Sequence, residues 1–286
     1  MRDLPLFHTK NLYHEDPFGQ LLWRKWFGDA FYSEMKNKFE LFGENASIAS
    51  SYSIEADLHS PQLKNFDATG KRIDQVIYHP SYHKLEELSY GSGIISIKYD
   101  KNYMSRFQSV RHLLGFSLGY YFAQSEMSLY CPICMTDGVG RVLEKHLKNN
   151  PEHSEVKKAL SHITSTDLGS LWQGAMFITE KQGGSDVGAN SVAAQEKDGH
   201  WFLSGDKWFC SNVDAQAILV LARMPNSTQG TKGLGLFLVL REVPKNNSET
   251  IQIHRLKEKL GVRSMPTGEV TLIQTPAFLL AGEGEG

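Results

Sequence analysis

The sequence predicts an α+β protein of more than one domain, in which an N-terminal helical domain precedes a mainly antiparallel β-barrel or β-sandwich domain. Up to about residue 168, apolar and aromatic residues recur at the spacing of helices. Beyond that point the apolar period shortens to two and turn signals become frequent. The length of 286 residues allows two domains. We therefore expect a helical domain over 1–168, a β domain over 169–280 and a linker-like end over 281–286.

Helical spacing is clearest in two segments of the first part. Their apolar positions are Leu21, Leu22, Trp26 and Ala30 in one, and Leu113, Leu114, Leu118 and Phe122 in the other. The second segment belongs to a run over 106–128 that predicts one long helix. Another helix can begin at Pro80, whose missing amide hydrogen costs nothing in the first turn. Residues 43–72 are polar and predict a long loop.

The second part opens with an apolar run over 171–180 and continues with a hairpin. Residues 193–197 and 200–205 flank Asp198-Gly199, a dipeptide typical of a two-residue hairpin turn. Further strands, separated by turn-rich segments, are expected at 215–224, 233–243, 250–256 and 268–274. The final LLAGEGEG has neither the pattern of a strand nor the length of a helix. It predicts either a frayed tail or a linker toward a further domain.

The composition of the chain bears on its partners and on its compartment. Thirty basic and thirty-two acidic residues are interspersed and give a formal net charge of −2, so neither a nucleic-acid-binding arm nor an acidic tail is indicated. No apolar stretch approaches the roughly 20 residues that cross a bilayer, and the first residues lack the apolar core of a signal peptide. Three cysteines are too few to staple this chain and suit a reducing compartment. We expect a soluble, cytoplasmic protein with no membrane partner.

Cys131 and Cys134 form a CPIC sequence, which has the spacing of a redox dithiol or of half a zinc site. Zinc is disfavoured because no second Cys or His pair follows at the spacing of a zinc finger. A thioredoxin-like site needs a strand before it, whereas the preceding residues predict a helix. We therefore favour buried structural thiols over redox chemistry and predict no metal site. Cys210 lies within an apolar strand and is expected in the core.

The sequence ITEKQGGSD, residues 178–186, interrupts an apolar run with two adjacent glycines. Glycine loses more conformational freedom on folding than any other residue, so Gly183 and Gly184 indicate a tight turn or a group that lies against the main chain. Asp186 is expected to be a turn or cap residue rather than a catalyst. The basic run over 254–263 is expected as a solvated strand and loop, with a phosphate-binding patch as the less favoured alternative.

Three motifs occur in the order and at the spacing found in one enzyme family. They are ITEKQGGSD at 178–186, LSGDKWFCSN at 203–212 and KLGVRSMPTGEV at 259–270. Together they resemble the middle β domain of the acyl-CoA dehydrogenases. GKRIDQVIYHPSYHKL at 70–85 and EMSLYCPICMT at 126–136 are similar to the branch containing the alkylation-response protein AidB. The resemblance covers about residues 55–286 and implies a C-terminal helical bundle that is absent from this chain.

The resemblance implies that the protein binds FAD, with the bare backbone at Gly183 and Gly184 allowing the isoalloxazine ring to approach. By motif position, the pyrimidine side would be lined by Met176, Ile178 and Thr179, the pyrophosphate would face Gly184 and Ser185, and the ring would meet Phe209 and, at N5, Ser211. Phe209 and Ser211 replace a tryptophan and a threonine that are frequent in the family, so the aromatic face and the hydroxyl are kept. Taken singly, the same residues are better explained as strand residues at Thr179 and Ser211, an ordinary core aromatic at Phe209 and a solvent-facing turn at the glycines. Taken together in this order, they favour flavin.

The reaction of the family is an α,β-dehydrogenation, in which a carboxylate removes the α proton of an acyl thioester and the β hydride passes to the flavin. In the family that carboxylate is a glutamate of the C-terminal helical domain. Glu283 and Glu285 lie in the linker-like end without a rigid element to hold them, so we assign no catalytic residue. The resemblance also implies an acyl-CoA substrate, an electron-transfer acceptor and a homo-oligomer when the chain is complete.

Three functional hypotheses remain open at this point. The first is an FAD-dependent acyl-CoA dehydrogenase-like oxidoreductase, represented by an incomplete chain that is inactive alone. The second is an AidB-like flavoprotein that protects against alkylation damage through nucleic-acid binding. The third is a non-catalytic interaction module without flavin. Bound flavin separates the third hypothesis from the others, and salt-dependent retention on DNA separates the second from the first.

Overall fold

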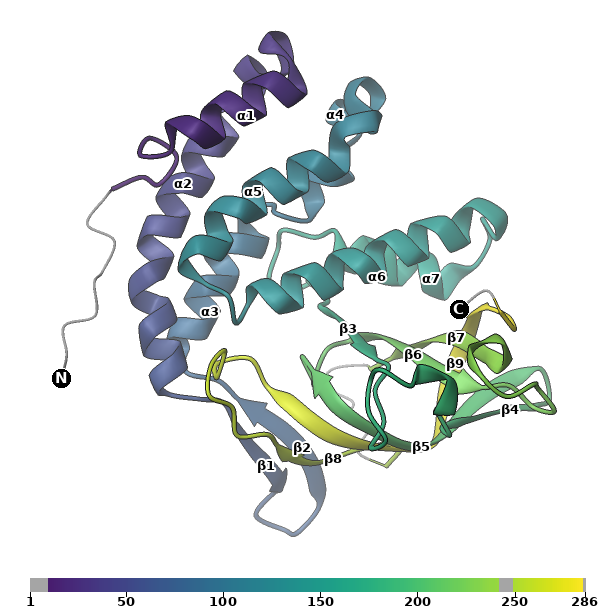
Figure 1. Ribbon diagram of the computed structural model, residues 1–286. Coiled ribbons are helices and arrows are strands. Elements are labelled where there is room, and N and C mark those ends of the chain that lie inside the picture. Colours follow the sequence, from purple (N-terminus) through teal and green to yellow (C-terminus); the bar gives the residue numbers. More distant parts are fainter. Residues whose placement is uncertain (1–9, 242–248, 285–286) are drawn as a thin grey trace.

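Helices form the first part of the chain and strands form most of the second, as the sequence predicts (Figure 1). The structure is a computed structural model and describes residues 10–241 and 249–284. Its α-helices are α1 Pro17–Phe27, α2 Asp29–Leu58, α3 Pro80–Glu86, α4 Lys101–Phe107, α5 Arg111–Ser125, α6 Tyr130–Asn149 and α7 Ser154–Ile163. No helix in these ranges is both long and apolar enough to cross a membrane.

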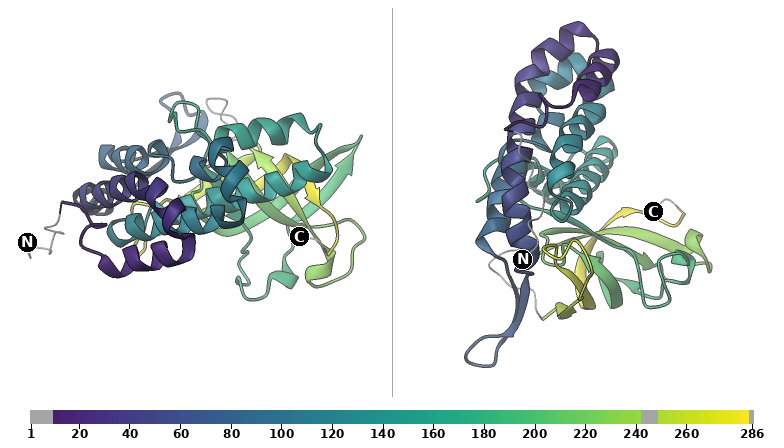
Figure 2. Two further views of the ribbon diagram at one scale, coloured as in Figure 1. Left: turned by 90° about the horizontal axis from the view of Figure 1, so that it is seen from above. Right: turned by 60° about the vertical axis from the view of Figure 1, so that its left-hand side comes forward.

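The strands form a two-stranded hairpin and a seven-stranded sheet. The hairpin consists of β1 Gln62–Phe66 and β2 Arg72–Ile77, and Figure 2 shows it projecting away from the helices. The larger sheet contains β3 Gly174–Phe177, β4 Ala193–Lys197, β5 His200–Ser211, β6 Ala217–Arg223, β7 Leu234–Leu240, β8 Ile251–Leu256 and β9 Thr267–Ala281.

The larger sheet closes into a barrel. Its strand order is β3-β6-β4-β5-β9-β7, and an additional pairing between β6 and β7 joins the path into a ring, with β8 paired to β9. The pairings β3–β6 and β4–β6 are parallel, and all the other pairings between the described strands are antiparallel. The predicted α+β architecture with a mainly antiparallel β-barrel is therefore confirmed.

Two hydrophobic clusters meet across β6 and β7, because alternate side chains of a strand point to opposite faces. Leu219 and Leu238 belong to the cluster formed by the helices. Val220 and Phe237, their neighbours along the strands, belong to the cluster inside the barrel. One outer face of the barrel therefore packs against the helical part. Met176 of β3 contacts the same helical cluster.

Several local predictions are confirmed by the backbone. Asp198 and Gly199 both have positive φ, 52° and 76°, as a mirror-image hairpin turn requires. α3 begins at Pro80, and the His79 side chain accepts a hydrogen bond from the amide of Ser81. The strands expected from 215–224, 233–243, 250–256 and 268–274 correspond to β6, β7, β8 and β9. Residues 242–248 and 285–286, which include the ends of two predicted segments, lie outside the described residues.

The loop predicted over 43–72 is wrong. α2 continues to Leu58, and the β1–β2 hairpin begins at Gln62. The first half of this helix buries large side chains, but from Gly43 onward its buried face is made of small residues and one asparagine, including Gly43, Ala46 and Ala49. A Cβ on Gly43 would lie 2.5 Å from the backbone nitrogen of Tyr13, so the neighbouring segment leaves no room for a larger side chain. Small buried residues give no strong apolar pattern, which is why the sequence does not predict the second half of this helix.

The apolar spacing noted over 21–30 does not mark the buried face of α1. Leu21 and Trp26 are exposed by 62% and 50%, whereas Trp23 and Phe31 are buried. The chain breaks its helical phase at Gly28, which has a φ of 77° and separates α1 from α2. A pattern that treats 21–30 as one helix therefore selects the wrong face.

Two further boundaries differ from the prediction. The long helix expected over 106–128 is interrupted by a 3-10 turn at Gln108–Val110. The end of the chain is strand for longer than expected, because β9 runs to Ala281 and Leu279 pairs with Phe237. The end of β9 depends on pairing with β7, which is far away in the sequence and which the local pattern cannot predict.

Candidate functional site

The candidate flavin-contacting residues lie where β3 ends and β5 passes beside it. The amide of Trp208 donates to the carbonyl oxygen of Thr179 over 2.8 Å. The side chain of Asn212 donates to the carbonyl oxygen of Gly174 over 3.1 Å. These bonds bring the first two sequence motifs together, with Thr179 on one segment and Phe209 on the other.

A buried ion pair fixes the turn that follows β3. Glu180 and Lys207 are exposed by only 3% and 1%, and their charged atoms lie 2.9 Å apart. Glu180 also accepts hydrogen bonds from the amides of Ser191 and Val192, at 2.7 and 3.0 Å. Burial alone would raise the pKa of Glu180, but these donors and Lys207 together hold its pKa below the ordinary value. Both residues belong to the quoted motifs, yet our sequence analysis assigned them no role.

Phe209 projects from the barrel because of a local backbone irregularity. Its φ is 61°, and the register of β5 against β9 shifts between Lys207 and Cys210. The extra residue of such a bulge turns its side chain out of the regular alternation. The ring is 53% exposed, so it is not the ordinary core aromatic that was the alternative interpretation.

The glycines leave the backbone bare beside Thr179. Gly183 has a φ of 113°, which favours glycine, and a Cβ there would meet no atom within 4 Å. A Cβ on Gly184 would lie 3.1 Å from the Thr179 hydroxyl oxygen. Gly184 and Ser185 are both exposed. An exposed aromatic ring, a hydroxyl and a backbone without side chains are the features that a planar, polar-edged ring such as flavin requires, so these residues fit that cofactor.

Met176 and Ile178 alternate with buried neighbours along the same segment. Both are half-buried, whereas Phe177 between them points into the barrel. A Cβ on Gly138 of α6 would lie 2.4 Å from the terminal methyl of Met176, so this side chain packs directly against that helix. The structure thus places Met176 closer to the helical core than the other candidate residues.

Ser211 lies at the end of β5, opposite Thr267 of β9. The two hydroxyl oxygens are 3.3 Å apart. Thr267 is buried, and its hydroxyl also accepts a hydrogen bond from Lys259 over 3.2 Å. The third motif therefore meets the second at Ser211, which the sequence order alone does not reveal.

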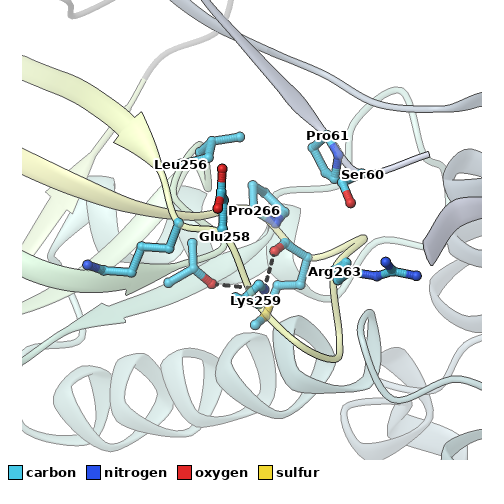
Figure 3. A pocket seen from close by; sticks show the side chains of 10 residues that line it. Ser60, Pro61, Leu256, Glu258, Lys259, Arg263 and Pro266 are labelled. Carbon is cyan, nitrogen blue, oxygen red and sulfur yellow. Dashed lines mark hydrogen bonds between the residues drawn. The ribbon is translucent and has the colours of Figure 1, made fainter. Parts of the chain in front are cut away.

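A hollow of about 240 Å³ adjoins these residues (Figure 3). It is lined by Ser60, Pro61, Leu256, Lys257, Glu258, Lys259, Arg263, Met265, Pro266 and Thr267. Arg263 reaches away to α2, where its Nε donates to Asp57 over 2.9 Å. The basic run predicted as a solvated strand and loop is therefore only partly solvated, since Lys257, Lys259 and Arg263 are half-buried.

Three cations lie near the ring of Trp208, and Glu269 pairs with two of them, Arg255 and Lys257. The Lys257 ammonium lies 3.4 Å from the ring centroid of Trp208. Lys181 and Arg255 lie at 5.6 and 6.0 Å from the same ring. These distances are within the range of cation–π attraction. The cluster borders the exposed Phe209.

The cysteine predictions are partly wrong. Cys210 is fully buried, as expected. Cys131 is half-buried and Cys134 is exposed, because the CPIC sequence begins α6 and the helical period turns Cys134 away from the core. Partial removal from water nevertheless raises the pKa of both thiols. All three cysteines are free.

Comparison with known proteins agrees with this arrangement. Residues 3–164 match the adaptive response protein AidB N-terminal domain, and residues 175–275 match the acyl-CoA dehydrogenase middle domain. The first match alone covers more than half of the chain. The chain belongs to the acyl-CoA dehydrogenase family. Within the family, its helical part is of the AidB type.

Individual relatives agree with this assignment. Acyl-CoA dehydrogenase family member 11 of Caenorhabditis elegans is 32% identical over 292 residues, which are 99% of this chain and 46% of the relative. The AidB protein of Escherichia coli K12 is 35% identical over 237 residues, which are 81% of this chain and 42% of the relative. The crystal structure of Caenorhabditis elegans ACDH-11 in complex with C11-CoA has a TM-score of 0.88 and 31% identity, covering 100% of this chain and 49% of that one. The chain spans about half the length of these relatives.

Proposed function

We propose that this family member binds FAD along the segment after β3 and the end of β5, as part of an acyl-CoA dehydrogenase-like oxidoreductase. The observation that carries the proposal is the outward ring of Phe209, held at a positive φ beside Thr179 and Ser211. Strained residues persist where the surrounding structure fixes them, and they cluster at functional sites. A solvent-exposed phenylalanine in a strained conformation gains little in the protein alone, whereas a stacked ring would bury it.

Each candidate residue has a physical role in this proposal. Phe209 stacks on the ring, while Met176 and Ile178 supply apolar contacts on the pyrimidine side. The hydroxyls of Thr179 and Ser211 donate to polar edges of the ring. Exposed amides and a hydroxyl at Gly184 and Ser185 face the pyrophosphate, as donors in a turn can do for anionic oxygen. Bound FAD would supply the capacity to accept a hydride; the protein supplies position and electrostatics.

The substrate and partners form part of the same proposal. The relative solved with C11-CoA supports an acyl-CoA thioester as the substrate class and α,β-dehydrogenation as the reaction. This chemistry requires an electron-transfer acceptor. The family resemblance implies that the partner in assembly is a further copy of the protein, in a homo-oligomer. We assign no catalytic base to this chain, and we expect these residues alone to hold flavin weakly and to be inactive.

Phe209→Ala tests the flavin site, with Phe18→Ala as its matched control. The two phenylalanines are exposed by 53% and 65%, but Phe18 lies on α1, outside the candidate site. Titration with FAD, followed by flavin fluorescence, should show weaker binding for Phe209→Ala and unchanged binding for Phe18→Ala. Equal affinities of all three proteins, or no binding by the wild type, would contradict the proposal. The second result would favour the non-catalytic module.

The cation cluster around Trp208 supports a second candidate, the protection against alkylation damage through nucleic acid that was inferred from the AidB resemblance. Lys181, Arg255 and Lys257 lie on one face beside an aromatic ring. Base stacking and phosphate contacts use the same pair of features in proteins that bind single strands. Retention of single-stranded DNA that falls steeply with salt, and that Lys181→Met weakens, would support this function. Salt-independent or absent retention would exclude it.

A further inference from the structure

Three polar groups form a directed chain from the hollow to the end of β5. The Lys259 ammonium donates to the carbonyl oxygen of Met265 over 2.6 Å and to the hydroxyl of Thr267 over 3.2 Å, as drawn in Figure 3. The Thr267 hydroxyl lies 3.3 Å from that of Ser211. Two hydrogen bonds, through Thr267, therefore connect the hydroxyl of Ser211 to the ammonium of Lys259.

The chemistry of the donors favours one direction for this chain. An ammonium group has three hydrogens and no acceptor site, so Thr267 must accept from Lys259. Acceptance from a cation polarises the Thr267 hydroxyl and makes it a stronger donor, so donation from Thr267 to Ser211 is the favoured direction of the 3.3 Å contact. In this arrangement the hydrogen of Ser211 points away from Thr267, out of the β5–β9 ladder.

The surrounding structure holds the three groups in place. Ser211 and Thr267 are register partners in the β5–β9 ladder, and Thr267 is exposed by only 1%. The loop that carries Lys259 is anchored at Arg263, whose amide and guanidinium both bind Asp57 of α2. A hydroxyl in so rigid a setting can be given one orientation at small additional cost in entropy.

We propose that Lys259 and Thr267 are positioning residues that turn the hydroxyl hydrogen of Ser211 toward N5 of the bound flavin. The inference rests on the proposed flavin site and goes beyond it, because neither residue contacts the cofactor in that proposal. Donation to N5 withdraws electron density from the atom that accepts a hydride.

The orientation should depend on pH. Burial lowers the pKa of Lys259 to about 8, so this donor is charged at neutral pH and becomes neutral in mildly alkaline solution. A neutral amine can accept a hydrogen bond, which allows Thr267 and then Ser211 to reverse. The titratable groups facing Lys259 are Cys131 of α6 and Asp57 of α2, together with Lys257, Glu258 and Arg263 of its own loop.

The decisive measurement is the ¹⁵N NMR signal of flavin N5, with labelled oxidised FAD and the protein in excess. A ring nitrogen that accepts a hydrogen bond with its lone pair resonates at lower frequency, so loss of donation moves the N5 signal to higher frequency. Lys259→Met and Thr267→Val should each produce this shift, and the double variant should shift no further. Thr267→Ser keeps the hydroxyl and should retain the wild-type signal.

Glu258→Gln is the control for charge, because Glu258 is exposed, lines the same hollow and adjoins Lys259 in sequence, and the variant changes the local charge by one unit. It should leave the N5 signal unchanged. If Glu258→Gln shifts N5 by as much as Lys259→Met, or if the shift of Lys259→Met persists fully in the Thr267→Val background, charge acts through space and the chain of hydrogen bonds is refuted. The N5 signal of the wild type should also change with an apparent pKa near 8, whereas that of Lys259→Arg should not.

A second measurement needs no flavin. Thr267→Val removes an acceptor of the charged ammonium, so the pKa of Lys259 should fall below about 8, as measured by ¹³C NMR of lysines labelled at Cε. An unchanged pKa would refute the contact between Lys259 and Thr267. Failure of the wild type to bind FAD would instead overturn the flavin site, and this inference with it, whereas normal FAD binding with an unshifted N5 signal would overturn this inference alone.

Discussion

At the scale of single residues, the buried pair of Glu180 and Lys207 determines the path of the chain at the candidate site. Glu180 binds two amides of the segment entering β4, and Lys207 additionally donates to the carbonyl oxygen of Ile178 over 3.2 Å. The pair therefore connects three separate stretches of backbone around the turn that contains the glycines. A buried pair of this kind adds little net stability compared with apolar residues, but removal of one partner leaves the other buried without compensation.

We expect Glu180→Gln to lower the free energy of unfolding by about 3 to 5 kcal/mol at pH 7, the usual result of breaking a buried pair. Because the folded-state pKa of Glu180 lies below its ordinary value, the carboxylate contributes its stability above about pH 4.3 and loses it as the pH falls through the folded-state pKa. The difference between wild type and variant should therefore shrink in acid. Chemical denaturation from pH 3 to 7 measures it.

The exposed pair of Arg106 and Glu34 provides the control for that experiment. Their charged atoms lie 2.9 Å apart, but the Arg106 side chain is 60% exposed. Arg106→Met should change stability by at most about 1 kcal/mol, as is usual for surface pairs. A loss for Glu180→Gln as small as this, or a loss that grows in acid, would contradict the role assigned to the buried pair.

Thr179→Val tests a single donor at the proposed cofactor edge. Reduction increases the negative charge on the N1 and O2 edge of a flavin, so a donor there stabilises the reduced form more than the oxidised form. Loss of one such bond costs about 0.5 to 1.5 kcal/mol, which lowers a two-electron midpoint potential by about 10 to 30 mV. Spectroscopic redox titration of the FAD-loaded protein measures the change. An unchanged potential with FAD still bound would place Thr179 away from that edge.

At the scale of elements, α2 shows how a helix can depend on the absence of side chains. Gly43 lies in the middle of the helix, where glycine is unfavourable by itself, and it allows the segment carrying Tyr13 to cross at close range. The amide of Leu12 donates to the carbonyl oxygen of Gly43 over 3.0 Å. The approach therefore provides a backbone hydrogen bond as well as packing.

Gly43→Ala should consequently destabilise the protein, although alanine is the better helix former. Crowding of this kind costs about 1 to 3 kcal/mol, which exceeds the gain of about 1 kcal/mol in helix propensity. Gly261→Ala is the matched control, because a Cβ there would meet no atom within 4 Å. Thermal and chemical denaturation should show a loss for Gly43→Ala alone, and a stabilised Gly43→Ala would disprove the close approach.

The same contrast explains how much of the fold could be predicted from the sequence. The strands and the Asp198-Gly199 turn follow from local alternation and turn chemistry, which the sequence shows directly. The continuation of α2 through Ala46 and the extension of β9 depend on partners far away in the chain. At the candidate site, motif order identifies Thr179 and Ser211, but the contact of Ser211 with Thr267 depends on the strand register. The exposure of Phe209 likewise depends on a bulge that no local pattern predicts.

At the scale of the whole molecule, the helical part and the barrel share an interface rather than a flexible connection. β6 and β7 present one set of side chains to the helices and the alternate set to the barrel interior. Polar contacts join the same parts, including the bond from the Tyr78 hydroxyl to Asp214 over 2.7 Å and the pairing of Arg263 with Asp57. Met176 lies on β3, which pairs with β6, and its side chain packs against Gly138 of α6, so the position of this candidate residue depends on both parts.

We therefore expect the two parts to unfold in one cooperative transition, which Leu238→Ala and Leu203→Ala test as a matched pair. Both leucines are fully buried, but Leu238 packs in the helical cluster and Leu203 in the barrel interior. Each truncation should cost about 2 to 5 kcal/mol, because it removes apolar contacts and leaves a cavity. Circular dichroism follows the helices, and the fluorescence of Trp201 and Trp208 follows the barrel once the other tryptophans are replaced. If the shared face couples the parts, each variant should lower the unfolding midpoint measured by the two signals to the same extent. If instead Leu203→Ala moves the barrel signal and leaves the helical transition in place, the parts are independent, and the helices do not support the candidate site through β6 and β7.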